Sequence, residues 1–428
     1  MQAEARPHLE RAGAGPPEVH LRVRFPLLRQ PICLIIDDPF PCQNLAYYEQ
    51  WPDPHVRDIP VRFLQAFADL CAEYGVRGKF SVLPYPAGLG RIDQGLRGVP
   101  QEELEAWLEV CRRDILPRFS IGPEILTHWY MLDLKTLRLT DCPEKVMEPR
   151  HTRESLAEYI AFGLEILKNV GLLATGVTSP GAFGRSIEPT YWRAIHDAVK
   201  RVTGSPVAWY FLHVDQYSPL VPPRAMLLDA QSGEGCVSIV SGSGDPLWRT
   251  QDPYNEPARI DEHITEDGQD GRLVRLFRGG GPIVWHTHWQ SLFSDGRETG
   301  LAALQEVFRR IRAHLGERVI WMTAAELAEY TLASSAVTVR IDRAQDGYAL
   351  RLESPFASRL LTFTLTLATP QAAAVREVRV DGHPLRWLAP AARVLEPHSW
   401  TRDADGVSWA CDLPARQIVT VTLLDSAR

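Results

Sequence analysis

The sequence lacks paired cysteines and any excess of basic charge. Its seven cysteines include no Cys-x-x-Cys pair and are odd in number, which argues against a zinc knuckle and against a full disulfide framework. The net charge is −7, and the 46 basic residues, only five of them lysine, are scattered along the chain. Because nucleic acid calls for a basic face on its partner, we do not expect this protein to bind nucleic acid.

The sequence also lacks a long apolar segment. No stretch could span a membrane, and the N-terminal segment MQAEARPHLERAGAGPPEVH contains acids and prolines where a signal peptide needs an apolar core. We therefore expect a cytoplasmic protein with no membrane contact. Its composition, 45% hydrophobic and 23% charged over 428 residues, is that of a globular chain long enough for two domains.

Residues 31–333 alternate short apolar runs with helical patterns, as in a protein built from βα units. One helix lies in PVRFLQAFADLCAEYGV, where Leu64, Phe67 and Cys71 recur at helical spacing and Gly75 stands at the expected C-cap. About seven such units predict an α/β fold, a distorted (β/α) barrel of about seven strands. Residues 1–30 would form an N-terminal extension.

The remaining residues, 334–428, read as short alternating strands separated by turn residues. This pattern predicts a C-terminal all-β sandwich domain. The boundary TLASSAV is short and contains no glycine or proline, so we expect the two domains to pack closely as one rigid unit.

Two adjacent aspartates end the first apolar run, ICLII. This run does not alternate, which indicates a strand covered on both faces. Asp37 and Asp38 would then stand where the strand leaves the sheet. Two neighbouring carboxylates repel unless a cation or a shared proton holds them, which suggests metal binding or acid/base chemistry. An ordinary Asp-Pro turn is the alternative.

Polar residues stand at several other predicted strand ends. The set is Asp37, Asp38, His128, Ser179, His213, Asp215, His286 and His288. A single histidine is more often structural than catalytic. In a βα barrel, however, the carboxyl ends of the strands meet at one face, so these side chains could converge. Sets of aspartate and histidine are what zinc and similar ions require.

The motifs at these strand ends occur in a defined order. They are Asp37-Asp38, then GKFSVLP, EILTHWYMLDLKT, TSPGAFG, and GPIVWHTHW followed by VIWMTAAELAEY. Over residues 31–330 this series resembles the polysaccharide deacetylase superfamily. The resemblance implies a distorted βα barrel that binds a divalent metal, usually zinc, through an aspartate and two histidines. It also implies removal of N- or O-acyl groups from a carbohydrate substrate.

Carried over by position, the resemblance makes Asp37 the general base and Asp38 a metal ligand. His128 matches the first histidine of the family's His-x-x-x-His motif, whose second position is occupied by Leu132. Leucine cannot bind a metal, and Asp133 is a possible substitute. The third ligand is therefore open among Asp37, Asp133, His213, Asp215, His286 and His288.

The late catalytic histidine of the family is matched by His286, which would protonate the leaving group. His288 is its rival and is our candidate for a metal ligand. The arginine that usually precedes the proline of the fourth motif is absent, because Thr178 and Ser179 stand there.

The substrate would contact aromatic and polar side chains near the strand ends. Aromatic rings offer flat platforms for sugars, although simple burial is the commoner role of tryptophan. The candidates for substrate binding are Tyr85, Trp129, Trp289, Ser179, His213 and Asp215, with Trp209 and Trp285 as further aromatic residues near strand ends.

Two other classes of function stay open at this point. One is glycoside cleavage on a related metal-binding barrel, with Asp215 or Asp245 as nucleophile or acid. The other is a carbohydrate-binding protein that has lost its metal, which Leu132 favours. The sequence does not specify the sugar, the acyl group or the oligomeric state.

Overall fold

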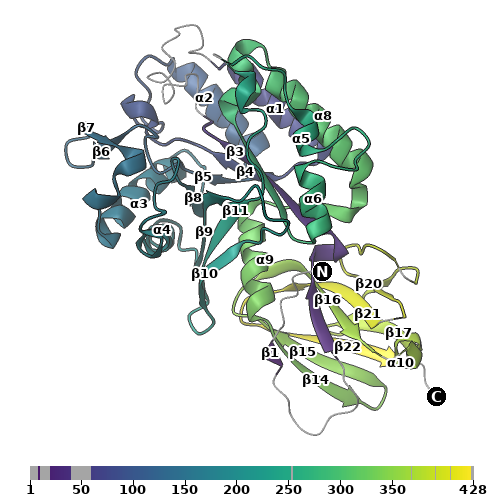
Figure 1. Cartoon of the computed structure of the whole chain (residues 1–428). Helices are drawn as coiled ribbons and strands as arrows, with labels where there is room; N and C mark the ends of the chain where they lie inside the picture. Colours follow the sequence, from purple (N-terminus) through teal and green to yellow (C-terminus); the bar gives the residue numbers. More distant parts are fainter. Residues whose placement is uncertain are drawn as a thin grey trace.

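The computed structural model describes residues 8–9, 20–39, 59–251, 254–367, 369–390, 392–404 and 406–425. Within these ranges the chain is a mixed α/β protein with several sheets (Figure 1). Most of the expected N-terminal extension, residues 1–7 and 10–19, lies outside the described residues. No helix in the described part is long and apolar enough to cross a lipid bilayer.

Two sheets form the α/β part. The first has the order β12-β3-β4-β5, with β13 also paired to β3; the second has the order β10-β11-β9-β8. Pairing is parallel except between β10 and β11. The bounds are β3 (Gln30–Asp37), β4 (Gly78–Ser81), β5 (Phe119–Gly122), β8 (Gly176–Thr178), β9 (Val207–Val214), β10 (Arg224–Asp229), β11 (Glu234–Ser241), β12 (Ile283–His288) and β13 (Val319–Trp321). A separate hairpin pairs β6 (Tyr130–Asp133) with β7 (Arg138–Pro143).

The sequence predicts one barrel, whereas the parallel strands are divided between these two sheets. Their edges are linked by single hydrogen bonds. The Thr178 N–H donates to the Pro123 carbonyl at 2.8 Å beside β5 and β8, and the Gly242 N–H donates to the Val284 carbonyl at 2.7 Å beside β11 and β12. The carboxyl ends of strands from both sheets therefore border the same region.

Strand β3 is buried on both faces, as its unbroken apolar run predicts. All eight of its residues are buried. Ile32, Leu34 and Ile36 belong to one apolar cluster, while Cys33 and Ile35 belong to another. Because successive strand residues point to opposite faces, the run supplies both clusters and places Asp37 at the strand's end.

Helices flank these sheets, with α1 and α8 on one side and α3 and α4 on the other (Figure 1). Gly75 ends α1 with φ of 68°, a left-handed conformation that glycine adopts readily, as predicted. The bounds are α1 (Val61–Tyr74), α2 (Gln101–Val110), α3 (Arg153–Asn169), α4 (Glu188–Thr203), α5 (Ile260–His263), α6 (Arg272–Gly279), α7 (Trp289–Phe293), α8 (Thr299–His314), α9 (Ala324–Ala336) and α10 (Thr369–Ala374).

The C-terminal residues form two further sheets, of orders β1-β14-β15-β22-β17-β18 and β19-β20-β21-β16-β2. Strand β2, from the expected N-terminal extension, pairs with β16, Val23 facing Phe363. The bounds are β1 (His8–Leu9), β2 (His20–Arg24), β14 (Thr338–Ala344), β15 (Gly347–Glu353), β16 (Ser358–Thr366), β17 (Val375–Val380), β18 (His383–Pro384), β19 (Arg386–Trp387), β20 (Ser399–Arg402), β21 (Gly406–Leu413) and β22 (Ile418–Asp425).

Helix α9 lies between the C-terminal sheets and the α/β part (Figure 1). One apolar cluster contains Trp209 of β9, Leu327 of α9, and Leu350 and Trp409 of the two C-terminal sheets. The two parts of the chain thus share buried side chains instead of being joined by an exposed tether.

His263, the last residue of α5, is a fully buried histidine. Its ring packs edge-on against Trp285 with centroids 5.0 Å apart, and neither ring nitrogen has a hydrogen-bond partner among the described residues. Burial lowers the pKa of His263 from 6.5 to about 4. The unfolded chain therefore takes up a proton on this ring near pH 6.5, and the folded chain does so only near pH 4. Its contribution to stability is present above pH 6.5 and is lost as the pH falls.

We expect the variant His263→Phe to be less sensitive to acid than the wild type. Phenylalanine keeps the ring packing against Trp285 and removes the group that must stay neutral. We compare the free energy of unfolding of the variant with that of the wild type. The difference, variant minus wild type, should rise by about 2 kcal/mol when the pH is lowered from neutral to near 5. Urea unfolding at both pH values measures this difference, with the exposed His383→Phe as control. If this difference does not change with pH, the pKa of His263 is not lowered in the folded protein.

Candidate active site

A cavity of about 440 Å³ opens at the carboxyl ends of β3, β8, β9 and β12. Pockets of this size accommodate small-molecule ligands. Its lining is Asp37, Asp38, Glu124, His128, Trp129, Tyr130, Pro143, Lys145, Thr178, Ser179, Pro180, Gly181, Phe211, Leu212, Val214, His286 and His288.

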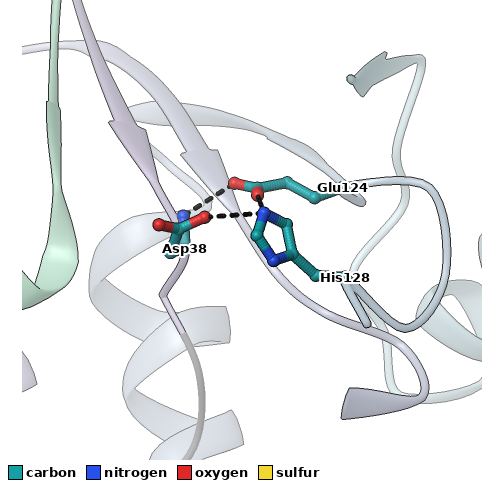
Figure 2. Close-up of side chains that lie close together, drawn as sticks. All are labelled: Asp38, Glu124 and His128. Carbon is teal, nitrogen blue, oxygen red and sulfur yellow. Dashed lines mark hydrogen bonds and ion pairs between the residues drawn. The ribbon is translucent and has the colours of Figure 1, made fainter. Parts of the chain in front are cut away.

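Three of these residues form a cluster that could hold a metal ion. Asp38, Glu124 and His128 each offer one ligand atom, and these atoms all lie within 4.8 Å of one another. His128 Nε2 is 3.1 Å from Asp38 Oδ1 and 3.1 Å from Glu124 Oε2 (Figure 2). Two carboxylates and one imidazole in a buried site are a donor set that suits zinc and related divalent ions.

The backbone turns at Asp38. Asp38 has φ of 61°, a left-handed conformation that costs energy for a residue with a Cβ. Its N–H donates to Glu124 Oε1 at 2.7 Å, and its Oδ2 accepts a bond from Gln290 Nε2 at 3.1 Å. Because of this turn directly after β3, Asp37 and Asp38 both line the cavity although they are adjacent in the sequence.

Glu124 is the residue that the sequence reasoning missed. It precedes His128 by four positions, the same spacing that separates His128 from Leu132. Leu132 lies in β6, is buried away from the cavity and donates its N–H to Tyr159. Asp133 accepts the backbone N–H groups of a turn and does not join the cluster. The sequence signal for this ligand is the glutamate that begins EILTH, four residues before the histidine.

A second buried glutamate fixes the backbone at His128, whose φ is 53°. Glu144 accepts the N–H of His128 at 2.7 Å and the N–H of Thr127 at 3.0 Å, and it also accepts the hydroxyl of Tyr159 at 2.8 Å. These bonds offset part of the cost of the left-handed conformation. Glu144 thus holds the His128 ring where it meets Asp38.

The cluster is a strongly coupled group of charges. Burial alone would lower the pKa of His128, but Asp38 and Glu124 outweigh it and raise the pKa to about 10. Burial alone would raise the pKa of Asp38, but the charges of His128 and His288 outweigh it and lower that pKa. In the metal-free chain His128 is therefore protonated at neutral pH. A metal must displace this proton, so metal affinity should rise with pH.

Asp37 is held by a lysine that is fully buried. Lys79 Nζ, from β4, donates to Asp37 Oδ1 at 2.6 Å and also to the Ser81 hydroxyl. Asp37 therefore has a cationic partner although the arginine of the fourth motif is absent. This ion pair orients the Asp37 carboxylate at the cavity wall, and Lys79 Nζ also lies 3.9 Å from Glu124 Oε1.

Of the two late histidines, His288 has the carboxylate partner. His288 Nδ1 bonds to Asp245 Oδ2 at 2.7 Å, and its ring packs edge-on against Trp248. Burial alone would lower the pKa of His288, but the bond to Asp245 raises it to about 9. His286 Nδ1 bonds to the Ser241 hydroxyl at 3.0 Å, and burial lowers its pKa.

This geometry differs from the expected roles. At neutral pH it is His288, not His286, that carries a proton into the cavity, because only His288 has a buried carboxylate beside it. His288 is not one of the three residues of the cluster, and its expected role as a metal ligand stays a prediction.

The expected substrate contacts divide into two groups. Trp129 and Ser179 line the cavity. Tyr85 and Trp289 do not; both are buried in the apolar core, and Trp289 packs against Phe63. The same holds for Trp209 and Trp285, which are 1% and 0% exposed.

His213 and Asp215 also lie away from the cavity. His213 bonds to Glu188 at 2.7 Å, and Asp215 accepts the backbone N–H groups of Tyr217 and Ser218 in a turn. Both are satisfied structural groups, so a role in substrate binding, or of Asp215 in glycoside cleavage, finds no support in their positions.

No family model matches the chain, and no curated protein matches it in sequence. Among solved structures, the chain is similar to a protein described as a probable polysaccharide deacetylase from Pseudomonas aeruginosa PAO1, at 11% identity and a TM-score of 0.43, over 70% of this chain and 89% of that one. Puue allantoinase matches at 12% identity and a TM-score of 0.40, over 70% and 88% of the two chains. A protein described as a "putative polysaccharide deacetylase" from Mycobacterium smegmatis matches at 14% identity and a TM-score of 0.39, over 77% and 94% of the two chains.

Proposed function

We propose that this protein is a metal-dependent hydrolase that removes an acyl group from an N- or O-acylated carbohydrate, on a distorted (β/α) barrel with a C-terminal β-sandwich. The observation that carries the proposal is the meeting of three elements in one cavity: the cluster of Asp38, Glu124 and His128, the carboxylate of Asp37, and the protonated ring of His288. Hydrolysis of an acyl group needs a metal or oxyanion stabiliser, a base and an acid.

Asp38, Glu124 and His128 would hold the cation, and their donor atoms fit a divalent ion. When bound, such an ion supplies Lewis-acid activation of the acyl carbonyl and of water. Zinc is the ion that we expect. This site has two carboxylates and one histidine, whereas the expected site has one carboxylate and two histidines. Oxygen ligands favour metals such as manganese more than imidazole does, so manganese and cobalt should be compared with zinc.

Asp37 would accept the proton of the attacking water, since its carboxylate lies at the cavity wall beside the cluster. Lys79 orients that carboxylate through the ion pair at 2.6 Å. His288 would donate a proton to the leaving nitrogen or oxygen. Because its pKa is raised to about 9, it carries this proton at neutral pH, and turnover should fall as the pH rises through about 9.

Other residues of the cavity lining supply contacts for a polar substrate. Trp129 offers a ring that is only partly buried, and the hydroxyl of Thr178 is buried at the lining with no hydrogen-bond partner among the described residues. An unpartnered hydroxyl and an aromatic ring in one cavity suit a sugar, which presents both hydroxyl groups and an apolar face.

Release of acetate from acetylated oligosaccharides tests this proposal. Protein loaded with zinc is incubated with N-acetylated and O-acetylated oligosaccharides, and free acetate and new reducing ends are both measured. We expect acetate without new reducing ends. New reducing ends without acetate would indicate glycoside cleavage, and neither product from any such substrate would require that the enzyme class be abandoned.

A further inference from the structure

A second cavity, of about 350 Å³, is rich in arginine. It is distinct from the candidate active site and lies beyond the carboxyl end of β11. Its lining is Gln216, Ser243, Gly244, Asp245, Pro246, Arg249, Arg259, Glu262, Arg272 and Arg275. We call it the arginine pocket. Four arginines and two carboxylates line it, and two further carboxylates, Glu256 and Asp270, pair with arginines at its rim.

Arg272 is the buried arginine of the arginine pocket. It is 7% exposed, and its guanidinium donates to the backbone carbonyls of Gly242, Asp215 and Ser218. No described carboxylate forms an ion pair with it. Carbonyl oxygens satisfy its N–H groups without cancelling its charge, so the positive field persists in a partly desolvated place.

The other three arginines stand at the rim in ion pairs that solvent reaches. Arg249 and Arg259 share the carboxylate of Glu256, and Arg275 pairs with Asp270 at 2.8 Å. These three arginine side chains are 48%, 48% and 52% exposed. Exposed pairs of this kind contribute little to stability, so an incoming anion can replace their carboxylates at small cost.

The two carboxylates in the lining do not oppose an anion strongly. Both oxygens of Asp245 are occupied, since Oδ1 accepts from Thr287 and Oδ2 from the His288 ring. Glu262 is 54% exposed and pairs with Arg259. The charge of Asp245 is therefore balanced by His288, and that of Glu262 is screened by water and by Arg259.

A separate observation also points to a ligand. Ser243 is 1% exposed and lines the arginine pocket, and its hydroxyl has no hydrogen-bond partner among the described residues. Buried hydroxyl groups are nearly always bonded, and leaving one unbonded is costly. A ligand oxygen beside Arg272 would accept this hydrogen bond.

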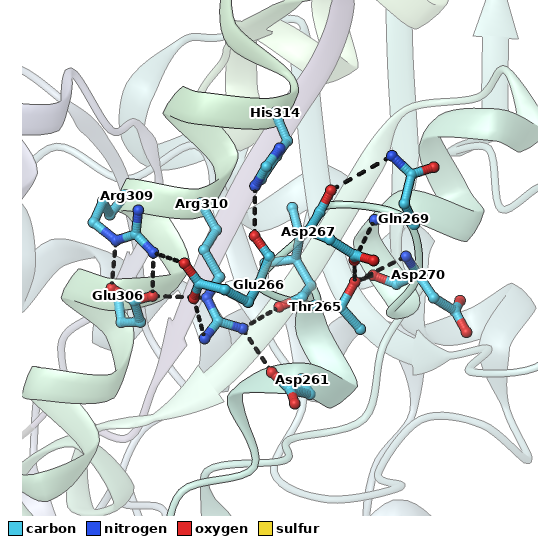
Figure 3. A network of polar contacts seen from close by, with 11 residues as sticks. Asp261, Thr265, Glu266, Asp267, Gln269, Asp270, Glu306, Arg309, Arg310 and His314 are labelled. Carbon is cyan, nitrogen blue, oxygen red and sulfur yellow. Dashed lines mark hydrogen bonds and ion pairs between the residues drawn. The ribbon is translucent and has the colours of Figure 1, made fainter.

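The segment that carries Arg259 is firmly anchored (Figure 3). Arg310 of α8 is 8% exposed and bonds to Asp261 in α5, to Glu266 in the following loop and to Glu306 in its own helix. Its neighbour Arg309 bonds to Glu266 and Glu306 as well. This network fixes α5 against α8, so the arginine pocket has a preformed wall.

We propose that the arginine pocket binds a phosphate-type or sulfate-type oxyanion, either as the free ion or as a substituent on a small molecule. Guanidinium groups match the geometry of such anions through paired N–H donors. The cavity has room for an anion together with a small organic group, such as a sugar ring. The proposal does not depend on the chemistry of the candidate active site.

Calorimetric titration of the full chain at low ionic strength tests it. The probes are inorganic phosphate, inorganic sulfate and glucose 6-phosphate, with glucose as the uncharged comparison. We expect the anions to bind and glucose not to bind. Tighter binding of glucose 6-phosphate than of inorganic phosphate identifies an anionic substituent as the ligand, and equal or weaker binding identifies the free ion.

The double variant Arg259→Gln/Arg275→Gln changes only exposed side chains and should fold normally. It should weaken anion binding at least about tenfold, since two charged hydrogen-bond donors are lost. Ser243→Ala should weaken binding several-fold. The matched control is Arg340→Gln/Arg386→Gln, which removes two exposed, ion-paired arginines of the C-terminal sheets and should change nothing. Failure of every anion to bind, or equal binding by the pocket variant and wild type, would overturn the proposal.

Discussion

Glu124→Gln should remove metal from the protein while leaving its fold intact. Glutamine has the shape of glutamate and can still accept the N–H of Asp38, but it is neutral and a weaker ligand. We expect metal affinity to fall by at least about a hundredfold, more than the roughly 10–100-fold that follows loss of a group that only supports a ligand. Acyl release should fall with it.

Competition of the protein with a chelator for zinc measures this effect. The matched control is Glu188→Gln, since Glu188 also bonds to a histidine, His213 at 2.7 Å, but outside the cavity. The control should bind zinc as the wild type does. Undiminished zinc binding by Glu124→Gln would show that Glu124 is not a ligand, and equal losses in both variants would show that the effect is not specific to the cluster.

Asp37→Asn should have the opposite pattern, with metal retained and turnover lost. Removing a positioned general base lowers turnover by roughly two to four orders of magnitude. The substitution also removes the nearer carboxylate partner of the buried Lys79 and leaves Glu124 Oε1 at 3.9 Å. Breaking a buried ion pair typically costs about 3–5 kcal/mol of stability, and we expect a smaller loss because Glu124 remains. The double variant Asp37→Asn/Lys79→Met removes both charges and should recover much of that stability without recovering turnover.

Three measurements on these two variants separate catalysis from folding: zinc content, acyl release and the free energy of unfolding. If Asp37→Asn releases acyl groups as fast as the wild type, Asp37 is not the general base. Loss of zinc from both variants would instead make Asp37 a ligand. If the double variant is as stable as wild type and still inactive, the loss belongs to chemistry and not to unfolding.

The elements of the α/β part could be predicted because their signals are local. The run ending at Asp37 has no alternation, and the strand is buried on both faces. Gly75 marks the end of α1 as its position predicts. The meeting of Asp38 and His128 also follows from strand ends that share one edge.

The sequence could not specify side-chain pairs whose partner is set by the path of the folded backbone. His128 alone does not say whether its partner lies four residues before or after it, and only the turn at residues 124–128 brings Glu124 to Asp38. Likewise, the choice between His286 and His288 depends on Asp245, more than forty residues away. Division of the strands into two sheets depends on edge bonds that no pattern of hydrophobicity encodes.

Metal analysis of the wild-type protein, purified without added metal, tests the central claim most directly. The account predicts about one divalent ion per chain, removable by a chelator and restored by zinc with an affinity that rises with pH. The same preparation of Glu124→Gln should contain almost none. Wild-type protein that contains no divalent ion and takes up no zinc would contradict the account.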